Sequence, residues 1–143
     1  MVDKALLLRK LAVLEEYVGQ IREYSTITSN QYVSDWKIQR IIERTLQIMI
    51  ETCVDIAGHI ISDRGYRIPK SYADTFRILY EENILESELF KTMEKMAKFR
   101  NIVVHNYDEV DPAIVVNILK SHLDDFLTYK DTILNILKEP NNT

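Results

Sequence analysis

Apolar residues recur along the chain at alternating steps of three and four, the spacing that places side chains on one face of an α-helix. The first stripe predicts a helix over about residues 3–26 and consists of Leu7, Leu11, Leu14, Val18 and Ile21. A longer stripe predicts a second helix and consists of Ile42, Leu46, Met49, Cys53, Ile56 and Ile60. We expect this second helix to begin between Ser29 and Ser34, both of which can cap a helix. It should end near Gly65, a residue suited to a left-handed stop.

Turn and capping residues delimit three further helices. Pro69 interrupts the chain, and Ser71 followed by Asp74 is typical of the start of a short third helix. A fourth helix is predicted over about residues 86–105. Asp111 before Pro112 predicts the start of a fifth helix that reaches about residue 138. Four long helices and one short one, joined by brief connections, predict an all-α up-and-down bundle that forms one domain over residues 1–143.

The composition is that of an ordinary globular protein. Of 143 residues, 46% are hydrophobic and 28% are charged, and only three glycines and three prolines are present. This scarcity argues against glycine-rich phosphate loops and against sheets with many tight turns. The single cysteine, Cys53, cannot form an internal disulfide, and we expect it to be buried. With no signal peptide and no apolar run long enough to span a membrane, we expect a cytoplasmic protein.

One charged residue stands where the pattern calls for an apolar one. In the predicted fourth helix, Arg100 continues the spacing of the stripe formed by Leu89, Met93 and Met96. A buried guanidinium without a partner would cost several kcal/mol, so it must meet a carboxylate, a dimer neighbour or a ligand phosphate. From its position alone, pairing with an acid on a neighbouring helix, such as Glu43 or Asp55, is the more ordinary explanation.

The residues that follow Arg100 change this balance. Arg100, His105 and Tyr107 lie within eight residues, in the sequence Arg-Asn-Ile-Val-Val-His-Asn-Tyr, which is an R-N-x-x-x-H-x-Y pattern. With this motif the chain resembles the HEPN superfamily, and most closely its HepT-like toxins. The resemblance covers nearly the whole chain and extends to Gln39–Arg40, to Pro69–Tyr72 and to the exit from Tyr107 toward Asp111.

The resemblance implies a metal-independent endoribonuclease that needs no cofactor. In this chemistry the 2′-hydroxyl of RNA attacks the adjacent phosphate and leaves a cyclic phosphate and a 5′-hydroxyl. We therefore expect His105 to act as general acid or base and Arg100 to clamp the phosphate in the transition state. Asn101, one turn before His105, is expected to orient the histidine. Tyr107 is expected to donate to phosphate or to stack on a base.

The spacing of the two catalytic candidates poses a geometric problem. On a regular helix, Arg100 and His105 are separated by about 140° in projection, so they do not share a face. Either the end of the helix is distorted, or another chain completes the site. The resemblance implies a two-fold homodimer whose paired motifs line one cleft. Such a dimer would also concentrate positive charge locally in a chain whose net charge is −4.

The resemblance gives Tyr107 a second role. HepT-like toxins are encoded beside a minimal nucleotidyltransferase antitoxin, MntA, which transfers AMP to the tyrosine of this motif. The added charge and bulk would compete with RNA phosphate and silence the site. A half-buried ring that packs against the end of the bundle is the structural alternative.

Other candidates carry weaker signals. Arg40 and Arg44, four residues apart, would extend an RNA groove, although the neighbouring Glu43 and Glu51 are equally typical of a solvated face. His59 is interpreted as a simple contact with Asp55, and His122 as a histidine at the edge of the core. The scattered histidines predict no metal site. A second hypothesis therefore stays open: a non-catalytic HEPN module that docks a nucleotidyltransferase and binds nucleotide or RNA through the same motif.

Overall fold

The computed structural model describes residues 2–139, and within them it is an all-α bundle. The four long helices are α1 (Lys4–Ile21), α3 (Trp36–Arg64), α5 (Ser87–His105) and α7 (Leu123–Lys138). The short ones are α2 (Ser29–Ser34), α4 (Tyr72–Glu81) and α6 (Pro112–Ser121), with 3-10 turns η1 (Arg22–Tyr24) and η2 (Tyr107–Glu109). The predicted bundle of four long helices is confirmed, and the number of short helices is larger than predicted.

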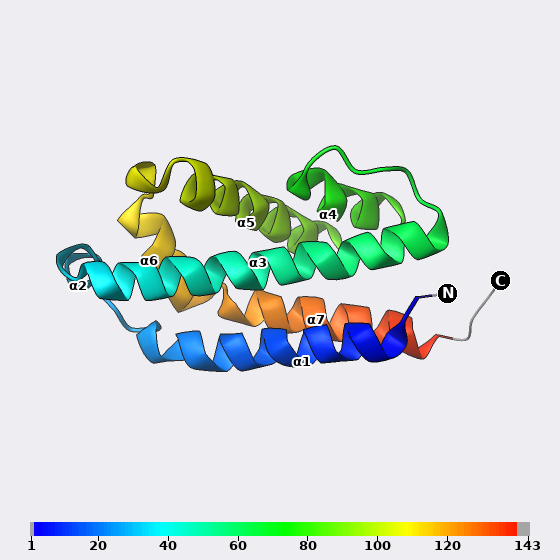
Figure 1. The fold of residues 1–143 in the computed structure, drawn as a ribbon, viewed down its shortest axis with the longest axis horizontal. Coiled ribbons are helices and arrows are strands. Elements are labelled where there is room, and N and C mark those ends of the chain that lie inside the picture. Colours follow the sequence, from blue (N-terminus) through cyan, green and yellow to red (C-terminus); the bar gives the residue numbers. More distant parts are fainter. Residues whose placement is uncertain (1, 140–143) are drawn as a thin grey trace.

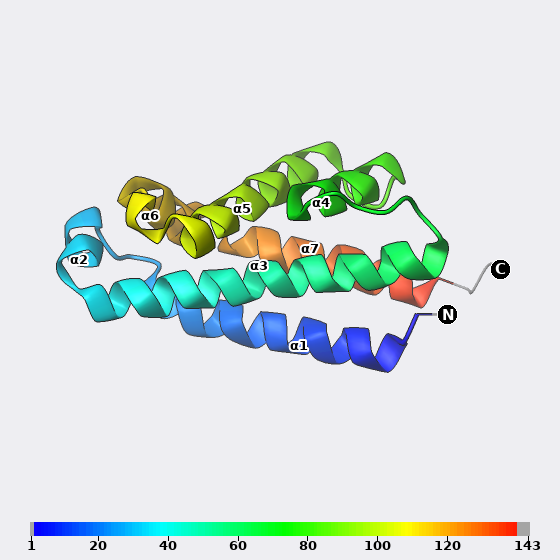
Figure 2. The ribbon, with the colours of Figure 1, turned by 45° about the horizontal axis from the view of Figure 1, so that its top comes forward.

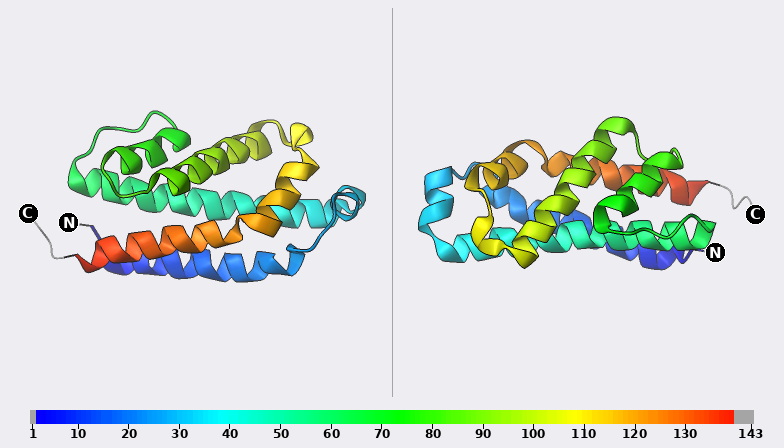
Figure 3. Two further views of the ribbon diagram at one scale, coloured as in Figure 1. Left: turned by 180° about the vertical axis from the view of Figure 1, so that it is seen from behind. Right: turned by 90° about the horizontal axis from the view of Figure 1, so that it is seen from above.

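Helix α3 is the centre of the arrangement. Helices α1 and α7 lie along one side of it, and α4 and α5 lie along the other (Figures 1 and 2). Seen from above, α5 crosses α3 obliquely (Figure 3). Helices α2 and α6 meet at one end of the bundle, whereas α1 begins and α7 ends at the other. The motif therefore lies on a helix that runs over α3 toward the end formed by α2 and α6.

The core is continuous along α3. The apolar stripes predicted for the first and second helices are buried in full, as are Leu89, Met93 and Met96 of α5. Tyr129 of α7 is fully buried, donates its hydroxyl hydrogen to the backbone oxygen of Cys53 at 2.8 Å, and packs edge-on against Phe76. Cys53 is a free, buried thiol, as expected, and burial raises its pKa.

The start of the second helix differs from the prediction. The hydroxyl of Thr28 caps a separate short helix, α2, through a reciprocal capping box with Gln31. At Asp35 the backbone is extended, with φ −129° and ψ 100°, and this carboxylate caps α3 by accepting from the amides of Lys37 and Ile38. The predicted caps Ser29 and Ser34 are wrong, because their neighbours Thr28 and Asp35 have the extended backbone of an N-cap and accept the capping hydrogen bonds.

The first and fifth helices also differ in extent. Helix α1 ends at Ile21 and passes into the turn η1, short of the predicted end at about residue 26. The fifth helix is divided into α6 and α7 at His122, where φ is −125° and ψ is 5°. This break lets α7 turn and pack against α1. No glycine or proline near His122 marks the break in the sequence.

Three predicted boundaries are confirmed. Helix α3 is followed by Gly65 in the left-handed conformation, at φ 68°. The hydroxyl of Ser71 accepts from the amide of Asp74 and begins α4, while Asp111 caps α6 ahead of Pro112. Among residues 2–139, no helix is long and apolar enough to cross a membrane.

Candidate functional site

The Arg100 guanidinium is held against helix α3. Its Nε and Nη2 atoms each lie 2.8 Å from Oε2 of Glu51, and its side chain is only 16% exposed. A second contact comes from Tyr72 at the start of α4, whose ring centroid is 4.6 Å from the Arg100 Cζ atom. Arg100 therefore does find a carboxylate on a neighbouring helix, but the predicted partners Glu43 and Asp55 are wrong.

Two amide side chains complete the contacts of Arg100 and Glu51. The Nη1 atom of Arg100 donates to Oδ1 of Asn101 at 3.3 Å, and Gln47 donates to Oε2 of Glu51 at 3.0 Å. Asn101 thus contacts the arginine, whereas we expected it to orient the histidine. Two of the five guanidinium hydrogens thus donate hydrogen bonds, and Nη2 adds an ion pair with Glu51. Among the described residues, each terminal nitrogen therefore keeps at least one hydrogen for a ligand oxygen.

His105 lies at the C-terminal end of the same helix and is exposed. Helix α5 remains α-helical through this residue, and the amide of Asn106 donates to the Ile102 oxygen at 2.8 Å. Of the two alternatives for the geometry of the motif, the distorted helix end is therefore wrong. Within residues 2–139, the imidazole makes no hydrogen bond or ion pair, with Arg100 or with any other residue. An exposed imidazole can exchange protons with solvent or with a substrate.

Tyr107 follows two residues later, at the start of η2, and its side chain faces solvent. The residue is 62% exposed, so the alternative of a half-buried ring packed on the bundle end is wrong. The Cζ atom of Arg40 lies 5.8 Å from the centroid of its ring. The motif end of α5 is thereby brought to the N-terminal part of α3, and an accessible phenol stands beside a cation.

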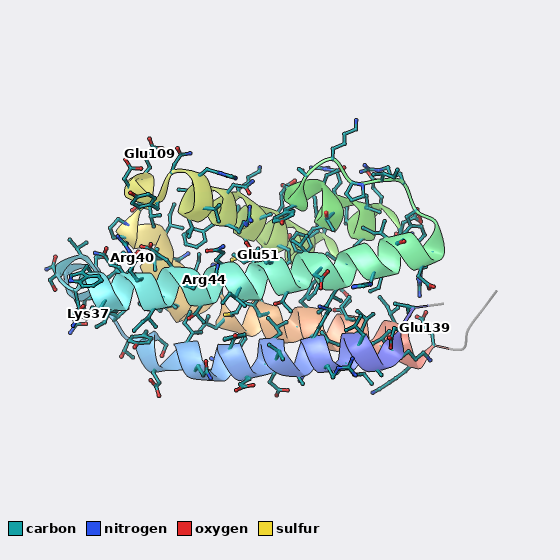
Figure 4. All side chains as sticks on the ribbon, viewed as in Figure 1. Lys37, Arg40, Arg44, Glu51, Glu109 and Glu139 are labelled. Carbon is teal, nitrogen blue, oxygen red and sulfur yellow. The ribbon has the colours of Figure 1, made fainter. Side chains whose placement is uncertain are left out.

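Arg40, Arg44 and Glu51 follow one another along α3 (Figure 4). Their spacing of four and seven residues places them on one stripe of the helix. Glu43 lies off this stripe and is only 7% exposed, accepting from the Tyr32 hydroxyl and lying 3.7 Å from Arg40. Its interpretation as part of a solvated face is wrong. Burial and this hydrogen bond raise the pKa of Tyr32.

The remaining histidines have the contacts expected of them. Nε2 of His59 lies 3.7 Å from Oδ1 of Asp55, one turn earlier. Nδ1 of His122 lies 2.8 Å from Oδ2 of Asp125 at the edge of the core. In the part of the chain that the structure describes, no group of three His, Cys, Asp or Glu side chains is placed to hold a metal ion.

The structure thus divides the predicted site into two parts on one surface. Arg100 and Asn101 are together over the middle of α3, and Tyr107 and Arg40 are together nearer its start. Sequence reasoning missed Glu51 and Tyr72 as the partners of Arg100. No local signal identifies them, because they lie 49 and 28 residues away along the chain.

Comparisons with known proteins identify the family of this chain. A family model described as ribonuclease HepT-like matches residues 14–133. The mRNA nuclease HepT of Shewanella oneidensis is 32% identical over 128 residues, which cover 90% of this chain and 96% of that protein. The tRNA nuclease HepT of Aphanizomenon flos-aquae is 29% identical over 130 residues, which cover 90% of this chain and 87% of that protein.

The comparison with solved structures also finds a HEPN toxin. The tri-AMPylated HEPN toxin of Shewanella oneidensis, solved in complex with MNT antitoxin, superposes with a TM-score of 0.84 at 31% identity. The match covers 93% of this chain and 99% of that one. The order of the helices, the motif at the end of α5 and both comparisons agree, and this chain belongs to the HepT-like ribonuclease family of HEPN proteins.

Proposed function

We propose that the protein is a metal-independent endoribonuclease toxin that acts in the cytoplasm and is neutralised by a nucleotidyltransferase antitoxin. The observation that carries the proposal is the half-buried, oriented Arg100 on the same helix as an exposed His105. The relatives supply the substrate class, since two of them are named as nucleases of mRNA and tRNA. A related toxin is held by an MNT antitoxin, which supports the partner.

In the proposed reaction, the 2′-oxygen of RNA forms a bond to phosphorus while the bond to the 5′-oxygen breaks. A base takes the proton of the 2′-hydroxyl, and an acid gives a proton to the leaving 5′-oxygen. His105 serves as one of these groups. The hydrogens left on the terminal nitrogens of Arg100 stabilise the negative charge that develops on the phosphate oxygens.

The geometry of α5 supports a homodimer for this chemistry. Because the helix is regular to its end, Arg100 and His105 of one chain point about 140° apart. A two-fold dimer that pairs the ends of α5 would bring the two motifs to one cleft. Such a cleft would also contain a second His105, so that one imidazole accepts a proton while the other donates one.

Tyr107 is the proposed site of regulation. Its phenol is exposed and stands beside Arg40, so an antitoxin can reach it. In the modification, the phenolic oxygen attacks the α-phosphate of ATP, the bond to the β-phosphate breaks and pyrophosphate leaves. The attached AMP would place a phosphate and a base on the RNA path and exclude substrate. The AMPylation of the related Shewanella toxin supports this assignment.

A second candidate is the non-catalytic binding module. The ion pair between Arg100 and Glu51 favours it, because a neutralised guanidinium attracts phosphate less strongly than a free one. A module of this kind would dock the nucleotidyltransferase and use the motif for anion recognition alone.

The test is RNA cleavage by purified protein in EDTA, after mass spectrometry has shown that Tyr107 carries no added mass. We expect cleavage to leave cyclic phosphate ends, and to fall by about 10²–10⁴ in His105→Ala and about 10²–10³ in Arg100→Ala. Arg77→Ala is the matched control, since Arg77 also pairs with a glutamate, Glu94, at 2.8 Å. Absence of cleavage by the dimeric, unmodified protein across several RNA classes would favour the binding module.

A further inference from the structure

A groove of ≈ 600 Å³ lies beside Arg100, between α3 and the segment that leads into α4. Val54, Gly58 and His59 of α3 form one wall, and Lys70 and Tyr72 form part of the other. None of these five residues has a role in the cleavage step proposed above. The groove is thus a concave surface for which the active-site chemistry gives no purpose.

The groove and the Arg100 contacts share two side chains. Glu51 and Tyr72 both line the groove, and both contact the guanidinium, at 2.8 Å and 4.6 Å respectively. A phosphate bound at Arg100 would therefore lie next to the opening of this groove. A polymer that extends from that phosphate along α3 toward Gly65 enters it directly.

The groove also continues the stripe of α3 that carries Arg40, Arg44 and Glu51. From Arg40 and Arg44, steps of three and four residues lead through Glu51 to Val54 and Gly58. At 1.5 Å per residue, the path from Arg40 to Gly58 is about 27 Å long, which is enough for several nucleotides. One continuous face of α3 thus connects the Tyr107 end, the Arg100 contacts and the groove.

The chemistry of the walls suits a nucleotide. Val54, the Gly58 backbone and the Tyr72 ring present apolar and aromatic surface, against which a base can pack. The Lys70 ammonium makes no hydrogen bond or ion pair among residues 2–139, although its charge contributes to the low pKa of Asp74. The groove's acidic Asp55 is already paired, with the Lys10 ammonium 2.5 Å from its carboxylate.

We propose that this groove is an RNA subsite that binds the nucleotide next to the scissile phosphate, with Lys70 contacting the flanking phosphate. The inference rests on the proposed ribonuclease function and deepens it. It assigns part of substrate binding to a surface that lies outside the R-N-x-x-x-H-x-Y motif. Within this assignment, Tyr72 has two neighbours, the catalytic guanidinium and the RNA base.

Gly58 offers a direct way to fill the groove. A Cβ atom built on Gly58 meets nothing within 4 Å, and the same holds for Gly19 on α1. Both glycines lie inside long helices, so Gly58→Leu and Gly19→Leu are matched substitutions of which only the first projects into the groove. Thermal unfolding of both variants checks that the fold is intact.

The experiment measures RNA binding in a His105→Ala background, which prevents cleavage. The probe is a fluorescent single-stranded RNA of about twelve nucleotides, within the usual range of single-strand site sizes. We expect Gly58→Leu to weaken binding about tenfold relative to Gly19→Leu, the effect of losing stacking on one base. Lys70→Ala should lower the slope of log Kd against log salt by about 0.7, and Lys70→Arg should restore it.

The outcomes separate this inference from the function on which it rests. If the His105→Ala parent binds no RNA at any salt concentration, the proposed function and the subsite both fail. If the parent binds RNA but Gly58→Leu binds as tightly as Gly19→Leu, the subsite alone is overturned. An unchanged salt slope in Lys70→Ala would likewise remove the phosphate contact. Since Lys70 is exposed, that measurement stands even if Gly58→Leu does not fold.

Discussion

Replacing Glu51 by glutamine should strengthen RNA binding, although it removes the negative charge of an ion pair in the folded protein. Three donors converge on Oε2 of Glu51: Nε and Nη2 of Arg100 at 2.8 Å and the Gln47 amide at 3.0 Å. Glutamine keeps an oxygen that can accept these hydrogen bonds but removes the negative charge. Arg100 should stay over Tyr72, with its own charge no longer neutralised.

The expected size follows from the geometry of the pair. Hydrogen bonds to charged groups contribute about 1.5–3 kcal/mol each, and the side chains of Arg100 and Glu51 are only 16% and 31% exposed. A phosphate that binds Arg100 has to displace part of the interaction between Arg100 and Glu51. We expect the Glu51 charge to account for a free energy close to the lower end of that range. Releasing about 1.4 kcal/mol corresponds to a tenfold lower Kd. The same change should lower the free energy of unfolding by about 1–2 kcal/mol.

The assay is fluorescence anisotropy with single-stranded RNA in a His105→Ala background, at one fixed salt concentration. Glu94→Gln is the control, because Glu94 pairs with Arg77 at 2.8 Å between α4 and α5 and its loss changes the net charge equally. A Kd that is unchanged or higher in Glu51→Gln would refute the reasoning. A decrease of equal size in Glu94→Gln would also refute it, since it would reflect net charge alone.

Three further predictions concern the scaffold. Gly58→Ala should raise the free energy of unfolding by about 0.5–1 kcal/mol in urea denaturation, since the added methyl group meets open space inside a helix. Tyr129→Phe should lower it by about 1–3 kcal/mol, since the buried oxygen of Cys53 loses its hydroxyl donor; thermal melts of equal midpoint would contradict this. The Arg67 guanidinium lowers the pKa of Asp74 to about 2, so this carboxylate stabilises the fold above pH ~4 and loses that effect as the pH falls toward 2. Asp74→Asn should therefore be less stable than the wild type at neutral pH, and the difference should disappear over that acid range.

The helices of this protein were largely predictable because their signals are local. Apolar stripes with a period near 3.6 residues fix which face of α1, α3 and α5 is buried, and every member of these stripes is buried in the structure. Gly65, Ser71 and Asp111 mark helix ends through their own backbone or side chain, and they act where the sequence predicts. The motif was visible for the same reason, since its members lie within eight residues of one another.

Features that depend on distant contacts were not predictable in this way. The break at His122 has no local signal, because it serves the packing of α7 against α1. The partner of Arg100 could not be identified, because any acid on the facing surface of α3 satisfies the same requirement for a countercharge. The way α5 crosses α3 places Arg100 2.8 Å from Glu51, and the packing of α4 places the Tyr72 ring centroid 4.6 Å from the same guanidinium. A residue pattern records which faces are buried, whereas the tertiary structure decides which side chains meet, because helix crossing angles arise from packing over the whole surface.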